Sequence, residues 1–149
     1  MRLNRAWIEA HIPHSGRMCL LDEVITWGAE RISCRSSGHR ALDHPLRSHG
    51  RLGIACGVEL AAQAMAVHGV LTARESDIAP RAGFLASVRG VRLHASRLDD
   101  VETDLICNAV RIAGDARTAL YEFELRSANM SLMSGRTTVV LDANYRAGR

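Results

Sequence analysis

Residues 53–69 read GIACGVELAAQAMAVHG, a run of small and apolar side chains with one carboxylate, Glu59, and one amide, Gln63, four residues later. From about Ile54 to Leu71 nearly every position suits a helix, and apolar residues lie on all of its faces. A helix that is apolar all round is a buried helix. The sequence therefore predicts one long core helix, ended by Gly69 and the polar residues 72–83.

Segments typical of β-strands lie on both sides of this helix. Two precede it, at residues 18–27 and 30–37, and four follow it, at 83–100, 104–112, 119–126 and 130–141, with Gly90 as a candidate bulge. Alternation in residues 119–126 places Tyr121, Phe123 and Leu125 on one side. Only a sheet wrapped around the helix can bury its whole circumference. We therefore expect an α+β fold, a central helix enclosed by a curved antiparallel sheet, in a single domain over residues 1–149.

Composition narrows the class of protein. The 149 residues are 47% hydrophobic and 23% charged, without a linker, so one soluble domain is expected. We find no apolar run near the roughly 18 residues that span a bilayer and no secretion signal, which predicts a cytoplasmic protein without membrane contact. The net charge of +3 is scattered, and six aromatic residues give little material for stacking bases, so no nucleic acid is expected. Four distant cysteines predict reduced thiols and no metal site.

Glu59 needs a physical explanation, because taking an ionised carboxylate out of water costs several kcal/mol. The dipole of the helix returns only ~0.3 to 1 kcal/mol. Glu59 must therefore face a polar cavity, be paired, or have a raised pKa. A carboxyl held in this way can act as a general acid. The structural alternative is an ion pair with an arginine, or a place at a subunit boundary.

Histidines supply the candidate base. The loop at residues 38–53 brings His44 and His49 just ahead of the helix, and a histidine suits a carboxyl that is kept partly protonated. Either one could instead be a solvated or capping side chain. His11 and His14 have an H-x-x-H spacing, but the proline between them argues against a helical metal pair. His68 is expected to be a satisfied core or interface residue.

Four segments resemble one family. They are IPHSGRMCLLDEV (residues 12–24), GVELAAQAMAVHG (57–69), PRAGFLASVRGVRLHASRLDD (80–100) and GRTTVVL (135–141). They resemble the hotdog-fold 3-hydroxyacyl acyl-carrier-protein dehydratases of the FabZ and FabA type, and most of all their aryl-polyene-type dehydratase-like subfamily. In this resemblance Glu59 matches the catalytic acid of the central helix, with Gln63 one turn below it.

The resemblance implies a dimer whose sheets join and whose active sites lie at the subunit boundary. One protomer offers the loop histidine, and the other offers Glu59. The substrate is a 3-hydroxyacyl thioester on the phosphopantetheine of an acyl carrier protein, or on coenzyme A, which loses water to give the trans-2-enoyl thioester without a cofactor. The resemblance implies that Gln63 binds the substrate, together with the backbone amides of Gly53 and Ile54. Phe84 and Leu85 would bind it on the strand that lines the acyl tunnel.

The loop departs from the family pattern. The usual sequence is G-H-F-P-G, with its histidine fourteen residues before the acid, and here that position is Pro45. His44 is one residue away, and His49 lies closer to the acid along the chain. Two interpretations stay open: an active dehydratase with a shifted loop, or a non-catalytic subunit that pairs with an active dehydratase paralogue. A third is an acyl thioesterase, in which the helix carboxylate serves the attack of water. The dimer would be homomeric or heteromeric.

Overall fold

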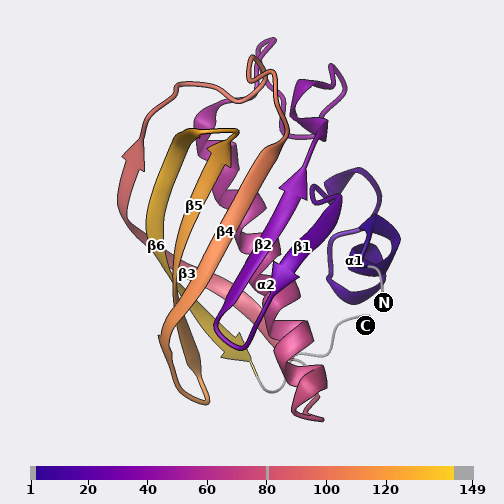
Figure 1. Ribbon diagram of the computed structural model, residues 1–149, viewed down its shortest axis with the longest axis vertical. Helices are drawn as coiled ribbons and strands as arrows, with labels where there is room; N and C mark the ends of the chain where they lie inside the picture. The colour runs from indigo at the N-terminus through magenta and orange to yellow at the C-terminus, as the bar shows by residue number, and fades with distance from the viewer. Residues whose placement is uncertain (1–2, 80, 143–149) are drawn as a thin grey trace.

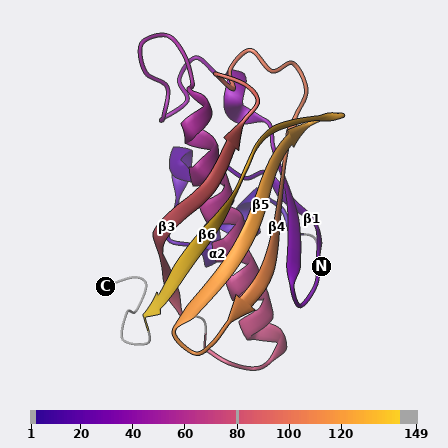
Figure 2. The same ribbon diagram turned by 90° about the vertical axis from the view of Figure 1, so that its left-hand side faces the viewer.

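The computed structural model describes residues 3–79 and 81–142, without the side chains of residues 82 and 142. One long helix, α2 (Gly57–Glu75), lies against one face of a six-stranded antiparallel sheet (Figures 1 and 2). The strands are β1 (Glu23–Trp27), β2 (Arg31–Ser36), β3 (Ala82–Leu93), β4 (Leu105–Gly114), β5 (Thr118–Ser127) and β6 (Met130–Asp142). A short helix, α1 (Arg5–His11), packs beside α2. The expected order of two strands, a long helix and four strands is confirmed.

The strands follow the order β1-β2-β4-β5-β6-β3, so that β1 and β3 form the two edges. Tyr121, Phe123 and Leu125 of β5 are buried, while Glu122 between them is exposed, which confirms the predicted alternation. Gly90 lies at a shift of register between β3 and β6 and has a φ of 58°, so the predicted bulge is confirmed too. A bulge bends its strand, and this bend lets the sheet curve around the helix.

The helix is longer than the sequence predicts. A 3-10 turn at Ile54–Cys56 leads into α2, which continues past Gly69 to Glu75. The prediction that Gly69 ends the helix is wrong, because a glycine inside a helix costs only about 1 kcal/mol relative to alanine and the flanking residues favour the helix. The side toward the sheet is buried and consists largely of Leu60, Ala61, Ala64, Met65, Val67 and Leu71.

The opposite side of α2 is not covered. Ala62, Ala66, Gly69 and Ala73 follow one another along one face, and they are partly or fully exposed. The expectation that the sheet buries the whole circumference is therefore wrong for a single chain. The sheet curves around one side only, as Figure 2 shows.

Length and composition alone would let residues 54–75 cross a membrane, with a mean hydropathy of 1.5. The expectation that no apolar run approaches this length is wrong for the segment. However, 61% of this apolar stretch is buried inside the protein. Burial of this kind is typical of the core helix of a globular fold, and it explains why the helix is so apolar.

The start of α2 is fixed to the connection between β3 and β4. Leu52 donates its N–H to Asp99 Oδ1 at 2.9 Å, and Ile54 donates its N–H to Ser96 O at 3.1 Å. The Arg97 guanidinium beside Asp99 holds the pKa of that carboxyl well below its usual range. The loop between β2 and α2 therefore ends at an anchored point, at the same end of the molecule as the helix start (Figure 1).

Candidate active site

Glu59 is the third residue of α2, and its side chain is 33% exposed. Its Oε1 lies 2.9 Å from His14 Nε2 and accepts a hydrogen bond from Gln63 Nε2 at 3.2 Å. Within residues 3–79 and 81–142, no arginine forms an ion pair with it. Of the three conditions that the sequence allowed for this carboxyl, the structure shows the pairing, and the partner is an imidazole.

His14 is the functional candidate that sequence reasoning missed. It lies in the segment between α1 and β1, its side chain is 30% exposed, and its Nδ1 is buried without a hydrogen-bond partner among the described residues. The H-x-x-H spacing drew attention to a metal pair, whereas the His11 ring stacks on Trp7. The only signal that could have found His14 is the proline-histidine pair in the segment that resembles the dehydratases.

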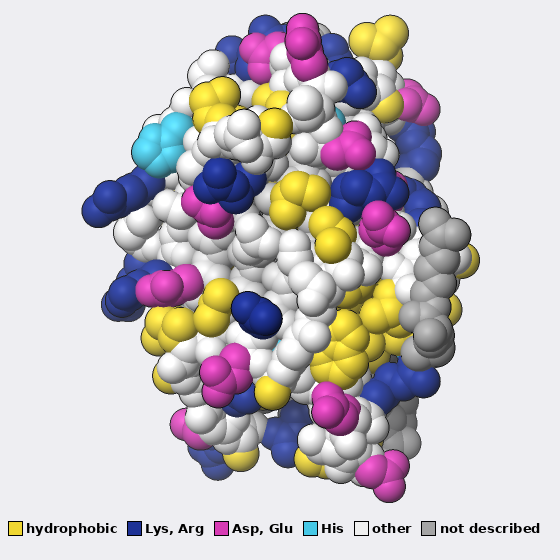
Figure 3. Space-filling model, in the orientation of Figure 1, with side chains coloured by type: hydrophobic (Ala, Val, Ile, Leu, Met, Phe, Trp, Pro, Cys, Tyr) yellow, Lys and Arg dark blue, Asp and Glu magenta, His cyan; other side chains and the backbone are white. Residues whose placement is uncertain are grey.

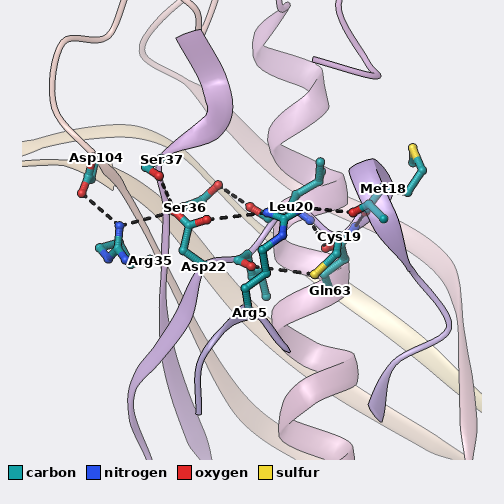
Figure 4. Close-up of polar contacts among 12 residues, drawn as sticks. Arg5, Met18, Cys19, Leu20, Asp22, Arg35, Ser36, Ser37, Gln63 and Asp104 are labelled. Atoms are coloured by element: carbon teal, nitrogen blue, oxygen red, sulfur yellow. Dashed lines mark hydrogen bonds and ion pairs between the residues drawn. The ribbon is translucent and has the colours of Figure 1, made fainter. Parts of the chain in front are cut away.

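Gln63 joins the His14 segment to the helix. Its Oε1 accepts the N–H of Leu20 at 2.9 Å, and its Nε2 donates to Met18 O at 2.7 Å (Figure 4). The same Nε2 also donates to Glu59. The Gln63 side chain is fully buried. All of these contacts are within the protein, so the structure gives Gln63 a positioning role. Its predicted contact with substrate stays a prediction.

A second set of contacts holds the same segment to the sheet. Ser36 Oγ donates to Leu20 O at 2.6 Å, and Arg35 donates to Glu23 at 2.9 Å and to Asp22 at 3.3 Å (Figure 4). The hydrogen bond that Arg35 donates to Glu23, with the charge of Asp22, raises the pKa of Arg35. The chain from Met18 to Glu23 is thus fastened on both sides, to α2 and to β2.

The loop histidines line a separate hollow. His44 and His49 surround an open space of about 550 Å³ together with Arg17 and Arg47, and Glu59 is not part of its lining. Desolvation by burial, followed by the charge of nearby His39, lowers the pKa of His44. The approach of a loop histidine to Glu59 was predicted across a subunit boundary, and it stays a prediction.

The two loop imidazoles differ in their contacts. His44 Nδ1 accepts the N–H of Leu46 at 3.1 Å. His49 has a left-handed backbone with a φ of 53°, and its Nδ1 lies 2.8 Å from Ser48 Oγ. Each ring therefore uses one nitrogen within the loop.

The remaining predicted site residues lie apart from this carboxyl contact. Ile54 uses its amide in the bond to Ser96 O, so it could serve a thioester oxygen only if that bond opened, and the role of Gly53 stays a prediction. Phe84 and Leu85 are 48% and 39% exposed on the edge strand β3. Their contact with an acyl chain stays a prediction as well.

Other polar groups of the core have structural explanations. His68 Nε2 lies 2.9 Å from Gly28 O and its Nδ1 lies 2.6 Å from the Tyr121 hydroxyl, which confirms it as a satisfied core residue. All four cysteines are free thiols, and burial raises the pKa of Cys107 to about 12. In the part of the chain that the structure describes, no three metal-ligating side chains gather.

Comparison with solved structures identifies the fold. The dehydratase heterocomplex ApeI:P from Xenorhabdus doucetiae matches with a TM-score of 0.81 and 23% identity, over 92% of this chain and 91% of that one. A thioesterase from Haemophilus influenzae matches with a TM-score of 0.60 and 14% identity, over 85% and 82%. A hypothetical thioesterase from Streptococcus pneumoniae, solved with coenzyme A, matches with a TM-score of 0.59 and 9% identity, over 80% of this chain and 84% of that one. The hotdog fold is therefore confirmed.

No curated protein matches the sequence. The model of the ApeP-like family, described as ApeP dehydratase, matches residues 6–147. This range contains α1 apart from its first residue, the His14 segment, α2 and strands β1 to β6. The chain therefore belongs to the ApeP-like dehydratase family.

Proposed function

We propose that this protein removes water from a 3-hydroxyacyl thioester to give the trans-2-enoyl thioester. The observation that carries the proposal is the Glu59 carboxyl at the start of α2, one third exposed and 2.9 Å from an imidazole. An exposed acid in contact with a histidine is the pair of groups that a proton-coupled elimination needs. Membership of a dehydratase family supports the same reaction.

The chemistry requires one acid and one base. A base first takes the proton on C2, which the thioester carbonyl makes acidic. Glu59 then gives a proton to the 3-hydroxyl as the C3–O bond breaks. Water leaves, and a double bond forms between C2 and C3. The base is a histidine, for which His44 and His49 are the sequence candidates and His14 is the structural one. Amides at the positive end of the helix, near Gly53, would bind the thioester oxygen. The elimination requires no cofactor.

We further propose that the acyl group arrives on the phosphopantetheine of an acyl carrier protein or on coenzyme A, in the cytoplasm. Arg17 and Arg47 at the loop hollow would attract an acidic carrier. Elsewhere positive and negative side chains are interspersed, as on the face in Figure 3, which offers no broad patch of one sign for nucleic acid. Phe84 and Leu85 would line the path of the acyl chain.

A second subunit would join at strand β3. This edge strand runs from Ala82 to Leu93 and exposes large apolar side chains, and a long apolar edge favours pairing with another strand. The partner would be a second copy or a different hotdog protein. Likeness to a heterocomplex supports pairing with a different hotdog protein. The alternative function, a non-catalytic subunit beside an active dehydratase, would use the same interface.

The test offers a 3-hydroxyacyl thioester on acyl carrier protein to the purified protein and records formation of the conjugated enoyl thioester. We expect turnover by the wild type and a loss of at least ~10²-fold for Glu59→Gln, because the amide cannot donate an acidic proton. Glu75→Gln is the matched control, since Glu75 is an exposed glutamate on the same helix, and its rate should be unchanged.

Each other outcome assigns a different function. Turnover that appears only after a second hotdog protein is added supports the partner subunit. Release of free thiol without enoyl product supports a thioesterase. Absence of both products, alone and in the mixture, would overturn the dehydratase proposal.

A further inference from the structure

We propose that His14 is the base of the pair, so that one chain supplies both the acid and the base. This inference rests on the proposed dehydratase function. It differs from the sequence-based expectation, in which a loop histidine of one subunit meets the acid of another. Among the described residues of this one chain, His14 is the imidazole in contact with Glu59, and the contact joins the segment after α1 to the first turns of α2.

The nitrogen that accepts a proton must hold a lone pair, and this condition argues against His44. A neutral imidazole has one such nitrogen. In His44 that nitrogen is Nδ1, because it accepts the N–H of Leu46, and the proton therefore sits on Nε2. His44 would have to lose a hydrogen bond of the loop before it could act. His49 keeps its Nδ1 beside Ser48 on an exposed loop.

His14 meets the condition through its contact with the acid. When Glu59 is protonated, the 2.9 Å contact lets the carboxyl donate to the lone pair of His14 Nε2. A substrate 3-hydroxyl that becomes the new acceptor of this proton releases the lone pair at the same moment. The base is therefore set free only when the leaving group is engaged.

The protons balance over one turnover. His14 Nε2 takes the C2 proton, the Glu59 proton passes to the 3-hydroxyl, the C3–O bond breaks, and water leaves with the enoyl thioester. This leaves an imidazolium beside a carboxylate. Because the two atoms lie 2.9 Å apart, the proton returns from His14 to Glu59 directly and restores the starting state. Because the acid and base atoms are in contact, they can also act on the adjacent carbons C2 and C3 from the same face of the substrate.

The surroundings hold His14 in this position. Gln63 forms hydrogen bonds with the backbone of Met18 and Leu20, four and six residues after His14. Ile12, two residues before His14, is buried. Gln63 also donates to the same Glu59 oxygen that His14 contacts. One buried amide thus positions both members of the pair, as catalysis of proton transfer requires.

The test separates the base step from the acid step. In deuterated water, exchange of the C2 proton of the substrate reports the base alone, and formation of enoyl thioester reports both steps. We expect His14→Gly to lose at least ~10²-fold in both readings and to recover in part when free imidazole is added. Glu59→Gln should lose dehydration but keep exchange.

Matched variants complete the design. His44→Ala and His49→Ala should stay within a few fold of the wild type, as should His94→Ala, the control for an exposed histidine just after β3. A His14→Gly protein that keeps the wild-type rate, or that is folded yet not rescued while His44→Ala is inactive, would overturn the assignment. Thermal unfolding of each variant shows whether it is folded.

A measurement without turnover distinguishes failure of this inference from failure of the proposed function. NMR titration of the His14 ring in the wild type and in Glu59→Gln reports whether the two groups share a proton. An unchanged titration means that the contact does not form in solution, which refutes the pair even in an active enzyme. A changed titration in a protein without turnover, alone or with a partner, refutes the proposed function and with it the base role.

Discussion

His68 on the long helix and His14 beside it show opposite arrangements. His68, in the second half of α2, is buried and has both ring nitrogens satisfied, by Gly28 O and by the Tyr121 hydroxyl. His14, opposite the first turns, is 30% exposed, and one of its nitrogens contacts a carboxyl while the other has no partner among the described residues. A ring whose hydrogen bonds are all made within the core stabilises the fold. A ring that faces an exposed acid can exchange protons with a ligand.

The comparison predicts that variants of His68 affect stability and not chemistry. We expect His68→Ala to lower the free energy of unfolding by about 2 to 5 kcal/mol, because it leaves a cavity and strands the Tyr121 hydroxyl and Gly28 O without their partner. Turnover per folded molecule should be unchanged. Urea unfolding, with the rate corrected for the folded fraction, measures both.

Tyr121→Phe is the graded companion of this variant. It removes only the hydroxyl, so that His68 Nδ1 loses one partner, and we expect a loss of about 1 to 3 kcal/mol. If His68→Ala instead abolished turnover in a fully folded protein, the division between a structural and a chemical histidine would be wrong.

The sequence predicted the fold well because the fold depends on periodicity. The apolar run at residues 54–71 and the alternation at 119–126 can only be buried by a helix against a sheet. Two predictions were wrong: the length of the helix, and the burial of its side away from the sheet. Gly69 is a weak stop, and the uncovered face with Ala62 and Ala66 looks as apolar in sequence as the buried one.

The site was predicted in part, for a physical reason. Glu59 is conspicuous because a carboxylate in an apolar helix needs an explanation. Its partner His14 lies 45 positions earlier, and sequence spacing carries no information about a contact made across the fold. The loop histidines looked better because they are near the acid along the chain. The hydrogen bond from the Leu20 N–H to Gln63 Oε1 brings the two segments together. It is likewise a tertiary contact, which sequence spacing does not reveal.

The same buried histidine predicts a dependence of stability on pH. Burial lowers the pKa of His68, so the unfolded chain binds this proton more readily than the folded one. Its contribution is therefore complete above the ordinary value of about 6.5 and is lost as the pH falls below it, at up to ~1.4 kcal/mol per pH unit. Urea unfolding between pH 7.5 and about 5 measures the slope.

The control for this slope is a second histidine with the same direction. Burial also lowers the pKa of His44, so it adds to the slope from the loop. We expect His68→Gln to flatten the curve more than His44→Gln, because His68 is the more deeply buried ring. If the two variants flattened the curve equally, His68 would not be the main cause of the loss of stability at low pH.

The smallest effect concerns the uncovered side of the helix. Gly69 is exposed within α2, and an added Cβ would meet no atom within 4 Å, so Gly69→Ala should raise the free energy of unfolding by about 0.5 to 1 kcal/mol. Gly57→Ala is the matched contrast on the same helix. Its Cβ would lie 2.5 Å from Met133 Sδ and 2.9 Å from Leu125 Cδ2, so it should destabilise the protein by about 1 to 3 kcal/mol. Urea unfolding at two protein concentrations tests both. A Gly69→Ala protein that is less stable only at the higher concentration would show that a second subunit packs closely on this face.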